Sequence, residues 1–235
     1  MTVPLEIIAH RGLLKGPSKV LENRKESLLK SLKLGFKLEL DTRSCLSGES
    51  VIHHDERILG VEIAKTTLSD LQSLDPGLLS LEAFLSQCST MSDTQVKINI
   101  DVKTCVFPAA FISLLEAYPK ISFELSSFDW TLLRQLHAVS TKRFVFSVLL
   151  ADSDTDPIAA LKSAVSVAKE IQAKRVTLQL PLLDKLSKAA LKELGDCRLG
   201  VYTVNEVAKL SELTDKGISY LFTDYPELFL DTVSA

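Results

Sequence analysis

Apolar, β-branched segments alternate along this chain with stretches in which apolar residues recur at helical spacing. Leu28, Leu29 and Leu32 line one such helical face, and residues 158–171 contain another. The segments predicted as strands are Leu5–Ala9, Phe36–Asp41, Val96–Lys103, Ile121–Ser126, Arg143–Leu149, Arg175–Leu180, Leu199–Val204 and Ser219–Thr223. Near-continuous apolar strands separated by helices are typical of a parallel sheet that is covered by helices.

Eight strand–helix units within 235 residues favour an α/β fold of the closed (β/α)8 TIM-barrel type over an open doubly wound sheet. No linker rich in Gly, Pro or Ser interrupts the pattern, so we expect a single domain over residues 1–235. Asn23 followed by Glu26 predicts a capping box that opens the first helix.

The interval between the second and third barrel strands departs from this rhythm. It contains a turn at Ser47-Gly48, a short strand near Val51–His53 and two helical patterns, Thr67–Leu74 and Leu79–Gln87. We interpret it as an elaborated loop after strand 2. Because the loops that follow barrel strands carry the chemistry of this fold, a substrate rim is expected here.

Four polar clusters lie at the ends of apolar segments: His10-Arg11-Gly12, Glu39-Leu40-Asp41, His53-His54-Asp55 and Asp101-Val102-Lys103. Together they supply histidines, carboxylates, an arginine and a lysine at the carboxyl ends of strands. Metal-assisted cleavage of a phosphate ester needs this combination, because charge on the phosphate must be stabilised and protons must be moved.

The carboxylates are candidates for a metal site. Glu39 and Asp41 are two residues apart on a strand and face the same way, so they repel unless a cation or a proton lies between them. Asp101 offers a third oxygen ligand, and a set of carboxylates suits Mg²⁺ or Ca²⁺, with Mn²⁺ as a further option, better than zinc. In the alternative interpretation Glu39 and Asp41 form ion pairs at the barrel rim with Lys37, Arg43 or Lys103.

The histidines and the two cations have separate tasks in this hypothesis. His10 and His54 titrate near neutrality, so one ring can accept a proton while the other donates one. His53 faces the opposite way from His54 on an extended strand. Arg11 can bind two phosphate oxygens at once, and Lys103 supplies a point charge.

Composition limits the partners and the location. The net charge of −3 argues against nucleic acid or an anionic membrane surface as the main partner. No run of about eighteen apolar residues predicts a membrane span, and no signal segment is recognised, so a cytoplasmic location is expected. The four cysteines are widely spaced, which is typical of reduced thiols.

Read in order, the motifs resemble the glycerophosphodiester phosphodiesterase family. The resemblance is collinear from residue 7 to residue 226. It rests on His10-Arg11-Gly12, Glu22-Asn23, Glu39-Leu40-Asp41, His54-Asp55, Asp101-Val102-Lys103, Ser126-Ser127-Phe128-Asp129, Thr203-Val204-Asn205 and Thr223-Asp224-Tyr225-Pro226. Asp101 stands where the family usually has Glu, and Tyr202 where it often has Trp.

The resemblance implies a phosphodiesterase barrel like that of phosphoinositide-specific phospholipase C. It implies an enzyme of lipid and glycerol metabolism that hydrolyses small glycerophosphodiesters to glycerol 3-phosphate and an alcohol. The roles it implies are His10 and His54 as the acid–base pair, Glu39, Asp41 and Asp101 as metal ligands, Arg11, Lys103 and Tyr202 as phosphate or substrate contacts, and Glu22 as a supporting residue. Asp224 is expected to close the last strand-to-helix turn.

Two alternatives remain open. A lysophospholipase D-like enzyme on the same barrel would need an apolar ledge for an acyl chain, for which Ile58, Leu59, Val61 and Ile63 are candidates. A catalytically silent barrel that binds a phosphorylated ligand is the second alternative, since a fold alone does not guarantee activity.

Overall fold

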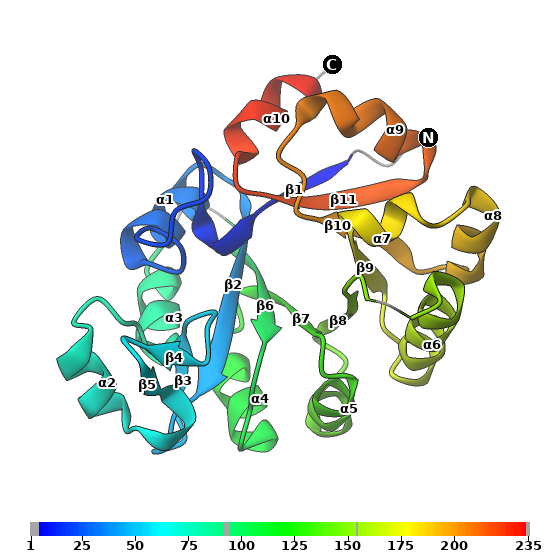
Figure 1. Ribbon diagram of the computed structural model, residues 1–235. Helices are drawn as coiled ribbons and strands as arrows, with labels where there is room; N and C mark the ends of the chain where they lie inside the picture. The colour runs from blue at the N-terminus through cyan, green and yellow to red at the C-terminus, as the bar shows by residue number, and fades with distance from the viewer. Residues whose placement is uncertain (1–4, 92–94, 154, 234–235) are drawn as a thin grey trace.

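The computed structural model describes residues 5–91, 95–153 and 155–233. Within them, eight parallel strands form a closed sheet, with β1 paired to both β11 and β2 (Figure 1). The barrel strands are β1 (Glu6–Ala9), β2 (Lys37–Ser44), β6 (Lys97–Val102), β7 (Ser122–Ser127), β8 (Val145–Leu150), β9 (Arg175–Gln179), β10 (Arg198–Tyr202) and β11 (Ile218–Thr223). Each overlaps a strand predicted from the apolar pattern, so the prediction of a TIM barrel is confirmed.

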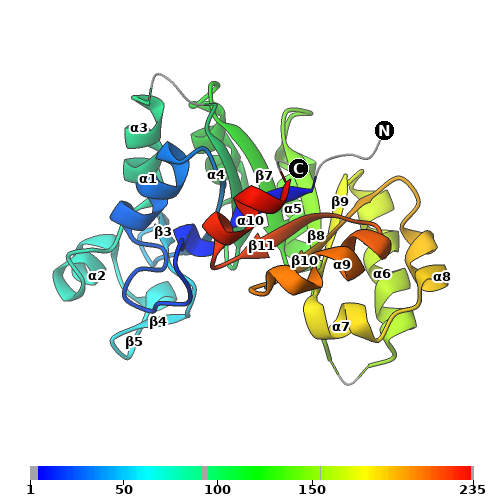
Figure 2. The same ribbon diagram turned by 90° about the horizontal axis from the view of Figure 1, so that it is seen from above.

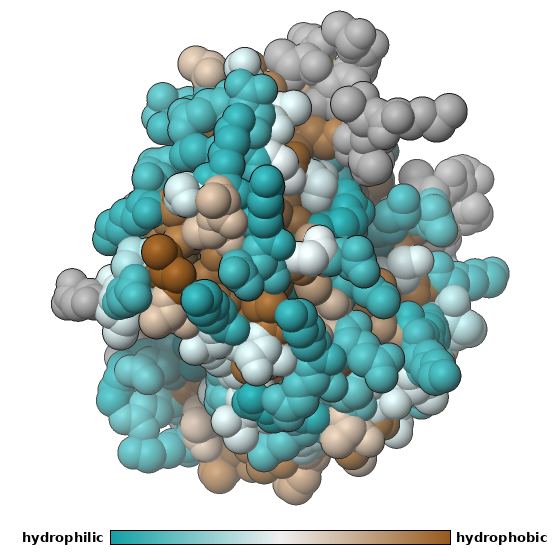
Figure 3. Space-filling model, turned by 90° about the vertical axis from the view of Figure 1, so that its right-hand side faces the viewer, coloured by the Kyte–Doolittle hydropathy of each residue, from teal (hydrophilic) through white to brown (hydrophobic). Residues whose placement is uncertain are grey.

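Helices connect consecutive barrel strands and surround the sheet (Figures 1 and 2). The α-helices of the described residues are α1 (Lys25–Lys33), α2 (Leu68–Leu74), α3 (Leu81–Ser89), α4 (Pro108–Glu116), α5 (Trp130–Val139), α6 (Pro157–Glu170), α7 (Leu180–Asp184), α8 (Lys188–Leu191), α9 (Leu210–Asp215) and α10 (Pro226–Val233). Short 3-10 turns complete the connections: η1 (His10–Gly12), η2 (Ile63–Lys65), η3 (Lys192–Leu194) and η4 (Val207–Lys209). The side of the molecule shown in Figure 3 is largely hydrophilic, with apolar residues scattered among polar ones.

The predicted elaboration after the second barrel strand is confirmed. There β3 (Ser50–Ile52) runs antiparallel to β2, and β4 (Arg57–Ile58) and β5 (Val61–Glu62) form a hairpin (Figure 1). The segment ends in α2 (Leu68–Leu74), whose first turn is capped by Thr67 through a bond from the Asp70 N–H. It has a small hydrophobic core of its own, so the excursion is a packed unit beside the barrel.

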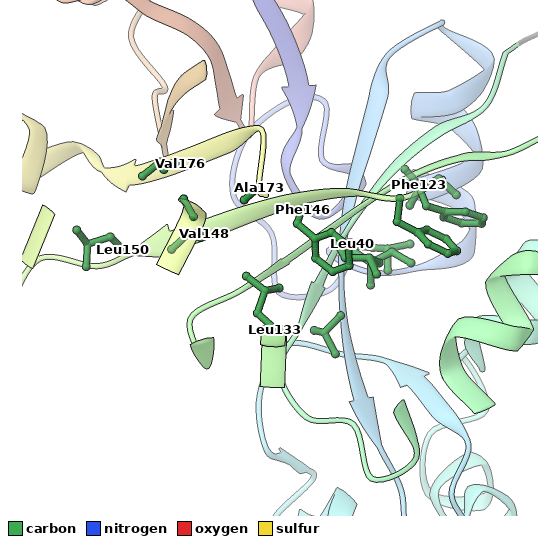
Figure 4. Packing of buried hydrophobic residues seen from close by; sticks show 14 of the residues in the cluster. Leu40, Phe123, Leu133, Phe146, Val148, Leu150, Ala173 and Val176 are labelled. Atoms are coloured by element: carbon green, nitrogen blue, oxygen red, sulfur yellow. The ribbon is translucent and has the colours of Figure 1, made fainter. Parts of the chain in front are cut away.

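The main hydrophobic core lies between the outer faces of the strands and the helices. Leu40 of β2, Phe123 of β7 and Phe146 of β8 are buried there together with Leu133 of α5 (Figure 4). Successive residues of a strand point to opposite faces, so the polar residues between these apolar ones point into the barrel. This alternation puts the polar groups of β2 and β6 inside the barrel.

The amino ends of the strands close the barrel interior with charged and aromatic groups. Lys37 Nζ lies 2.5 Å from Glu124 Oε2, and Arg175 Nη2 lies 2.7 Å from Glu6 Oε2. The buried ring of Tyr220 fills the space between the strands, where a Cβ at Gly200 would approach the ring to 2.0 Å. These side chains fill the barrel interior at its amino end, so a pocket can open only at the carboxyl end.

Among the helices in the described part of the chain, none is both long enough and apolar enough to span a membrane.

Candidate active site

A pocket of about 440 Å³ lies at the carboxyl end of the barrel, and its lining combines charged, aromatic and aliphatic side chains. The predicted site residues that line it are His10, Arg11, Glu39, Asp41, His54, Asp101, Lys103 and Tyr202. Glu22 does not line the pocket but accepts a hydrogen bond from Arg11 Nη1 at 2.9 Å. The barrel therefore brings together residues that lie up to 192 positions apart (His10 and Tyr202) in the sequence.

The turn after β1 depends on an unusual backbone at Arg11. Its φ of 53° is in the left-handed region, which residues other than glycine rarely adopt. The Arg11 N–H donates to Glu39 Oε2 at 2.8 Å, and its carbonyl accepts from the Asn23 N–H at 3.0 Å. Gly12 follows with φ 71°, and a Cβ there would lie 2.9 Å from the backbone of Leu28. These contacts direct both His10 and Arg11 to the pocket.

The three carboxylates form one buried cluster. Asp41 and Asp101 face each other across the β2–β6 pairing, and Glu39 is one pleat below Asp41 on β2. One oxygen from each lies within 4.8 Å of the others. Asp101 Oδ1 is buried and has no hydrogen-bond partner in the described residues. An unpaired buried carboxylate oxygen is costly, and a cation bound among the three would satisfy it.

The pKa values of the three carboxyl groups also indicate a site for a cation. Burial raises the pKa of Glu39 to about 7, and the negative charge of Asp41 contributes to this rise. Burial and Asp41 also raise the pKa of Asp101 to about 6, although Lys103 opposes the rise. Burial would raise the pKa of Asp41 too, but Lys103 and Arg11 lower it to about 2. These all-oxygen ligands fit a hard divalent ion.

Two cations border the carboxylates. Lys103 Nζ lies 3.0 Å from Asp41 Oδ1 and 2.5 Å from Asp101 Oδ2. Arg11 Nε lies 3.3 Å from Asp41 Oδ2. The ion-pair interpretation of the sequence is therefore correct for Lys103. The other two candidates have different partners: Lys37 pairs with Glu124 at the amino end, and Arg43 Nε donates to the His54 carbonyl at 2.8 Å.

His10 is held by a carboxylate from the last barrel strand. Its Nδ1 lies 2.7 Å from Asp224 Oδ1, which leaves Nε2 free of that bond. Burial would lower the pKa of His10, but the bond to Asp224 and the charge of Glu39 outweigh burial and raise the pKa. Asn205 Nδ2 donates to the second Asp224 oxygen at 2.8 Å, so the carboxylate is itself fixed.

His54 has a more open environment. Its Nδ1 lies 2.6 Å from Asp55 Oδ1, and the His54 side chain is 33% exposed. Burial lowers its pKa, and the nearby Asp41 charge offsets this only in part. His53 is not among the residues that line the pocket, and its Nε2 approaches the Arg57 carbonyl at 3.3 Å.

Two residues near the site have contacts that the sequence did not predict. Asn23 was expected to cap α1, but that helix begins at Lys25, and its N-cap residue is Arg24, whose side chain does not cap the helix. Asn23 Nδ2 instead donates to Asp41 Oδ2 at 2.9 Å, so the prediction of a capping box is wrong. Asp224 lies at the expected turn, and the structure adds its bond to His10. The Glu-Asn and Thr-Asp-x-Pro motifs marked both positions without indicating these partners.

The apolar part of the lining comes from several loops. Phe128 and Tyr202 pack edge to face, with ring centroids 5.7 Å apart. Leu149, Leu180, Pro181 and Phe222 also line the pocket.

The apolar ledge proposed after strand 2 is not formed as expected. Ile58 and Ile63 are buried inside the small core of the excursion, and Leu59 is 78% exposed. None of these residues lines the pocket, because the hairpin turns its apolar side towards α2.

Solved structures of similar fold cover nearly the whole chain. A glycerophosphodiester phosphodiesterase from Parabacteroides distasonis is 20% identical, with a TM-score of 0.78 and coverage of 100% of this chain and 98% of that one. One from Thermotoga maritima is 24% identical, with a TM-score of 0.75 and coverage of 99% and 100%. A phosphodiesterase from Oleispira antarctica, solved with the product sn-glycerol-3-phosphate, is 17% identical, with a TM-score of 0.76 and coverage of 99% and 98%.

These likenesses establish the fold. None of the curated proteins matches the chain. A family model, that of the glycerophosphoryl diester phosphodiesterase family, matches residues 10–228, which include all the charged residues that line the pocket. The chain therefore belongs to the glycerophosphoryl diester phosphodiesterase family, as its motifs predicted, and is an enzyme of the phosphoric diester hydrolase class.

Proposed function

We propose that the protein hydrolyses glycerophosphodiesters to glycerol 3-phosphate and an alcohol, with the help of one divalent cation. The observation that carries this proposal is the three buried carboxylates, two histidines and two cations that line one pocket. Family membership supports the substrate class. The Oleispira antarctica structure with sn-glycerol-3-phosphate supports the product.

Glu39, Asp41 and Asp101 would hold the cation, for which Mg²⁺ and Ca²⁺ are the best candidates and Mn²⁺ a third. When bound, such an ion neutralises negative charge on the phosphate oxygens. Asn23 supports this role because it fixes the orientation of Asp41 by hydrogen bonds to both its carboxylate and its N–H.

His10 and His54 would exchange protons with the substrate in two balanced steps. In the first, a glycerol hydroxyl attacks phosphorus and gives its proton to one histidine, while the other protonates the leaving alcohol. This forms a cyclic phosphate. In the second, water attacks phosphorus and the proton transfers reverse, which opens the ring and restores both histidines. Asp224 and Asp55 hold the Nδ1 atoms, so each Nε2 remains for the substrate.

Arg11 and Lys103 would contact the non-bridging phosphate oxygens. Both lie beside the carboxylates and line the pocket, so they are placed to stabilise negative charge that develops on the phosphate. Glu22 would act through Arg11, whose guanidinium it holds at 2.9 Å. Tyr202 would form part of the wall against the carbon skeleton of the substrate.

The test is release of glycerol 3-phosphate from glycerophosphocholine and glycerophosphoethanolamine, first with EDTA and then with added Mg²⁺, Ca²⁺ or Mn²⁺. We expect release that requires metal and that disappears in His10→Ala. If lyso-phospholipids are cleaved faster than glycerophosphocholine, the lysophospholipase D alternative replaces this proposal. The apolar residues that this alternative requires as a ledge, at positions 58–63, do not line the pocket, which counts against it. Binding of glycerol 3-phosphate without turnover of any diester would favour the silent barrel.

A further inference from the structure

Asn99 is a polar residue of the pocket to which the reaction described above gives no task. It lies on β6 two residues before Asp101, so both side chains face the barrel interior. Its strand neighbour on β2 is Glu39, one level below the Asp41–Asp101 pair. Asn99 is fully buried and lines the pocket, which places it at the pocket floor.

The amide of Asn99 is fixed at one end and unpaired at the other. Ser126 Oγ donates to Asn99 Oδ1 at 2.9 Å, which determines the orientation of the amide. No acceptor in the described residues takes a hydrogen bond from Asn99 Nδ2, although this atom is buried. Native proteins pair nearly all their buried donors, and an unpaired N–H group loses its hydration without compensation. A donor of this kind beside a pocket is suited to a ligand.

The neighbouring hydroxyl groups of the floor are already engaged. Thr177 Oγ1 lies 3.0 Å from Ser147 Oγ and 2.8 Å from the Tyr220 hydroxyl. The Tyr220 hydroxyl in turn lies 3.1 Å from the Val176 carbonyl. These hydroxyl groups are therefore occupied with one another, whereas Asn99 Nδ2 is left to donate a hydrogen bond to a ligand.

We propose that Asn99 determines specificity by donating a hydrogen bond to a hydroxyl oxygen of the glycerol moiety. This inference rests on the proposed function. Arg11 and Lys103 match the charged phosphate, whereas a neutral amide donor matches a neutral oxygen. Two residues along a strand span about 6.6 Å, so Asn99 lies about that distance below Asp101, with which Lys103 Nζ pairs. A phosphate bound at that upper level would extend its glycerol carbons down to the floor.

A buried donor of this kind discriminates between substrates, because a ligand that lacks the hydroxyl leaves the amide unpaired. The hydroxyl beside the phosphate ester attacks phosphorus in the proposed reaction, so the terminal glycerol hydroxyl is the one left for Asn99. Glycerol-bearing diesters would therefore be favoured over diesters that keep the attacking hydroxyl and lack the terminal one. Ser126 acts as a positioning residue, since its hydroxyl orients the amide.

The test compares Asn99→Leu with wild type in two assays. Calorimetry measures the binding of sn-glycerol 3-phosphate and of methyl phosphate, which has the phosphate without the glycerol hydroxyls. Kinetics measures kcat/KM on glycerophosphocholine and on 2-hydroxyethyl phosphocholine, which keeps the hydroxyl that attacks phosphorus and lacks the terminal one. We expect binding of sn-glycerol 3-phosphate and kcat/KM on glycerophosphocholine to fall about tenfold, the equivalent of one neutral hydrogen bond. The binding of methyl phosphate and kcat/KM on 2-hydroxyethyl phosphocholine should change less than about twofold by the same reasoning.

Thr42→Val is the matched control. Thr42 Oγ1 is also buried and, among the described residues, has no hydrogen-bond partner, but Thr42 does not line the pocket. Its replacement should leave both ligands and both substrates unchanged. Asn99→Ala carries the same test if the Leu variant does not fold.

Equal losses for glycerol-bearing and glycerol-free compounds would overturn the inference, and so would no loss for either. Failure of wild type to release glycerol 3-phosphate from any diester would instead count against the proposed function. The calorimetric comparison of the two phosphates would still decide the role of Asn99 in that case.

Discussion

The two ends of the barrel both bury charged groups, but they balance them differently. At the amino end, Glu6 and Glu124 face Lys37 and Arg175, with Arg175 Nε 3.2 Å from Glu124 Oε2. Arg198 Nη1 adds a third cation 3.6 Å from Glu6. At the carboxyl end, the carboxylates Glu39, Asp41 and Asp101 have Arg11 and Lys103 as their cations.

The pKa values show what this difference means. Burial would raise the pKa of Glu6, but Lys37 and Arg175 outweigh it and lower the pKa. Burial and a neighbouring carboxylate instead raise the pKa of Glu39 and of Asp101 at the other end. At the amino end, cations thus balance the buried carboxylates. At the carboxyl end, where the pocket lies, the carboxylates outnumber the cations. Uncompensated charge in a cleft is typical of a functional site.

The largest expected effect comes from the histidines beside the carboxyl-end cluster. His10→Ala and His54→Ala should each lower kcat by about 10²–10⁴-fold, because each removes one of the two proton transfers. Metal affinity measured by calorimetry should remain close to wild type, since the carboxylates are intact. Near-normal kcat in either variant would refute the acid–base assignment.

A change at the amino end should affect stability instead. Glu124→Gln removes one of the two carboxylates that pair with Lys37 and Arg175, the other being Glu6, and breaking a buried ion pair in this way costs about 3 kcal/mol. For a chain of this size that corresponds to a fall in Tm of roughly 6–12 °C, measurable by calorimetry. The kcat/KM at 25 °C should stay within about twofold of wild type, because residues at the amino end of the barrel contribute to stability and not to the reaction. A loss of activity without a loss of stability would contradict the division between the two ends.

The smallest effect is expected for Asp101→Glu, which lengthens one proposed ligand by a methylene. Activity should persist, with a changed order of preference among Mg²⁺, Ca²⁺ and Mn²⁺, because these ions differ in the ligand distances and geometry that they accept. The measurement is kcat/KM with each ion in turn. Complete loss of metal binding in this variant would mean that the cluster is built around the shorter carboxylate.

The apolar periodicity of the sequence was sufficient for the barrel, because near-continuous apolar strands and helical spacing are properties of local segments. It also located the groups that follow strands, such as His10 and Asp101. Pairings between distant segments could not be derived in this way. Asp224 lies 214 residues from His10, and they meet because β1 and β11 are neighbours in the closed sheet.

Lys37 illustrates a second reason for error. It faces the same side of β2 as Glu39 and Asp41, as an alternating pattern requires, and so was a reasonable partner for them. Two residues along a strand span about 6.6 Å, however, so the barrel divides one strand face between two ends with different tasks. Lys37 consequently pairs with Glu124 of β7, whose side chain no local pattern in β2 could indicate.

The central claim is that the excess carboxylates at the carboxyl end form a site for a divalent cation. Its most direct test is the Tm of metal-free wild type and of Glu39→Gln, each measured with EDTA and then with saturating Mg²⁺, Ca²⁺ or Mn²⁺. We predict that at least one ion raises the Tm of wild type and that this rise is largely lost in Glu39→Gln. In EDTA the Glu39→Gln variant should be at least as stable as wild type, because the substitution relieves the repulsion between the carboxylates. An equal rise in both proteins, or no rise in wild type with any ion, would contradict the account.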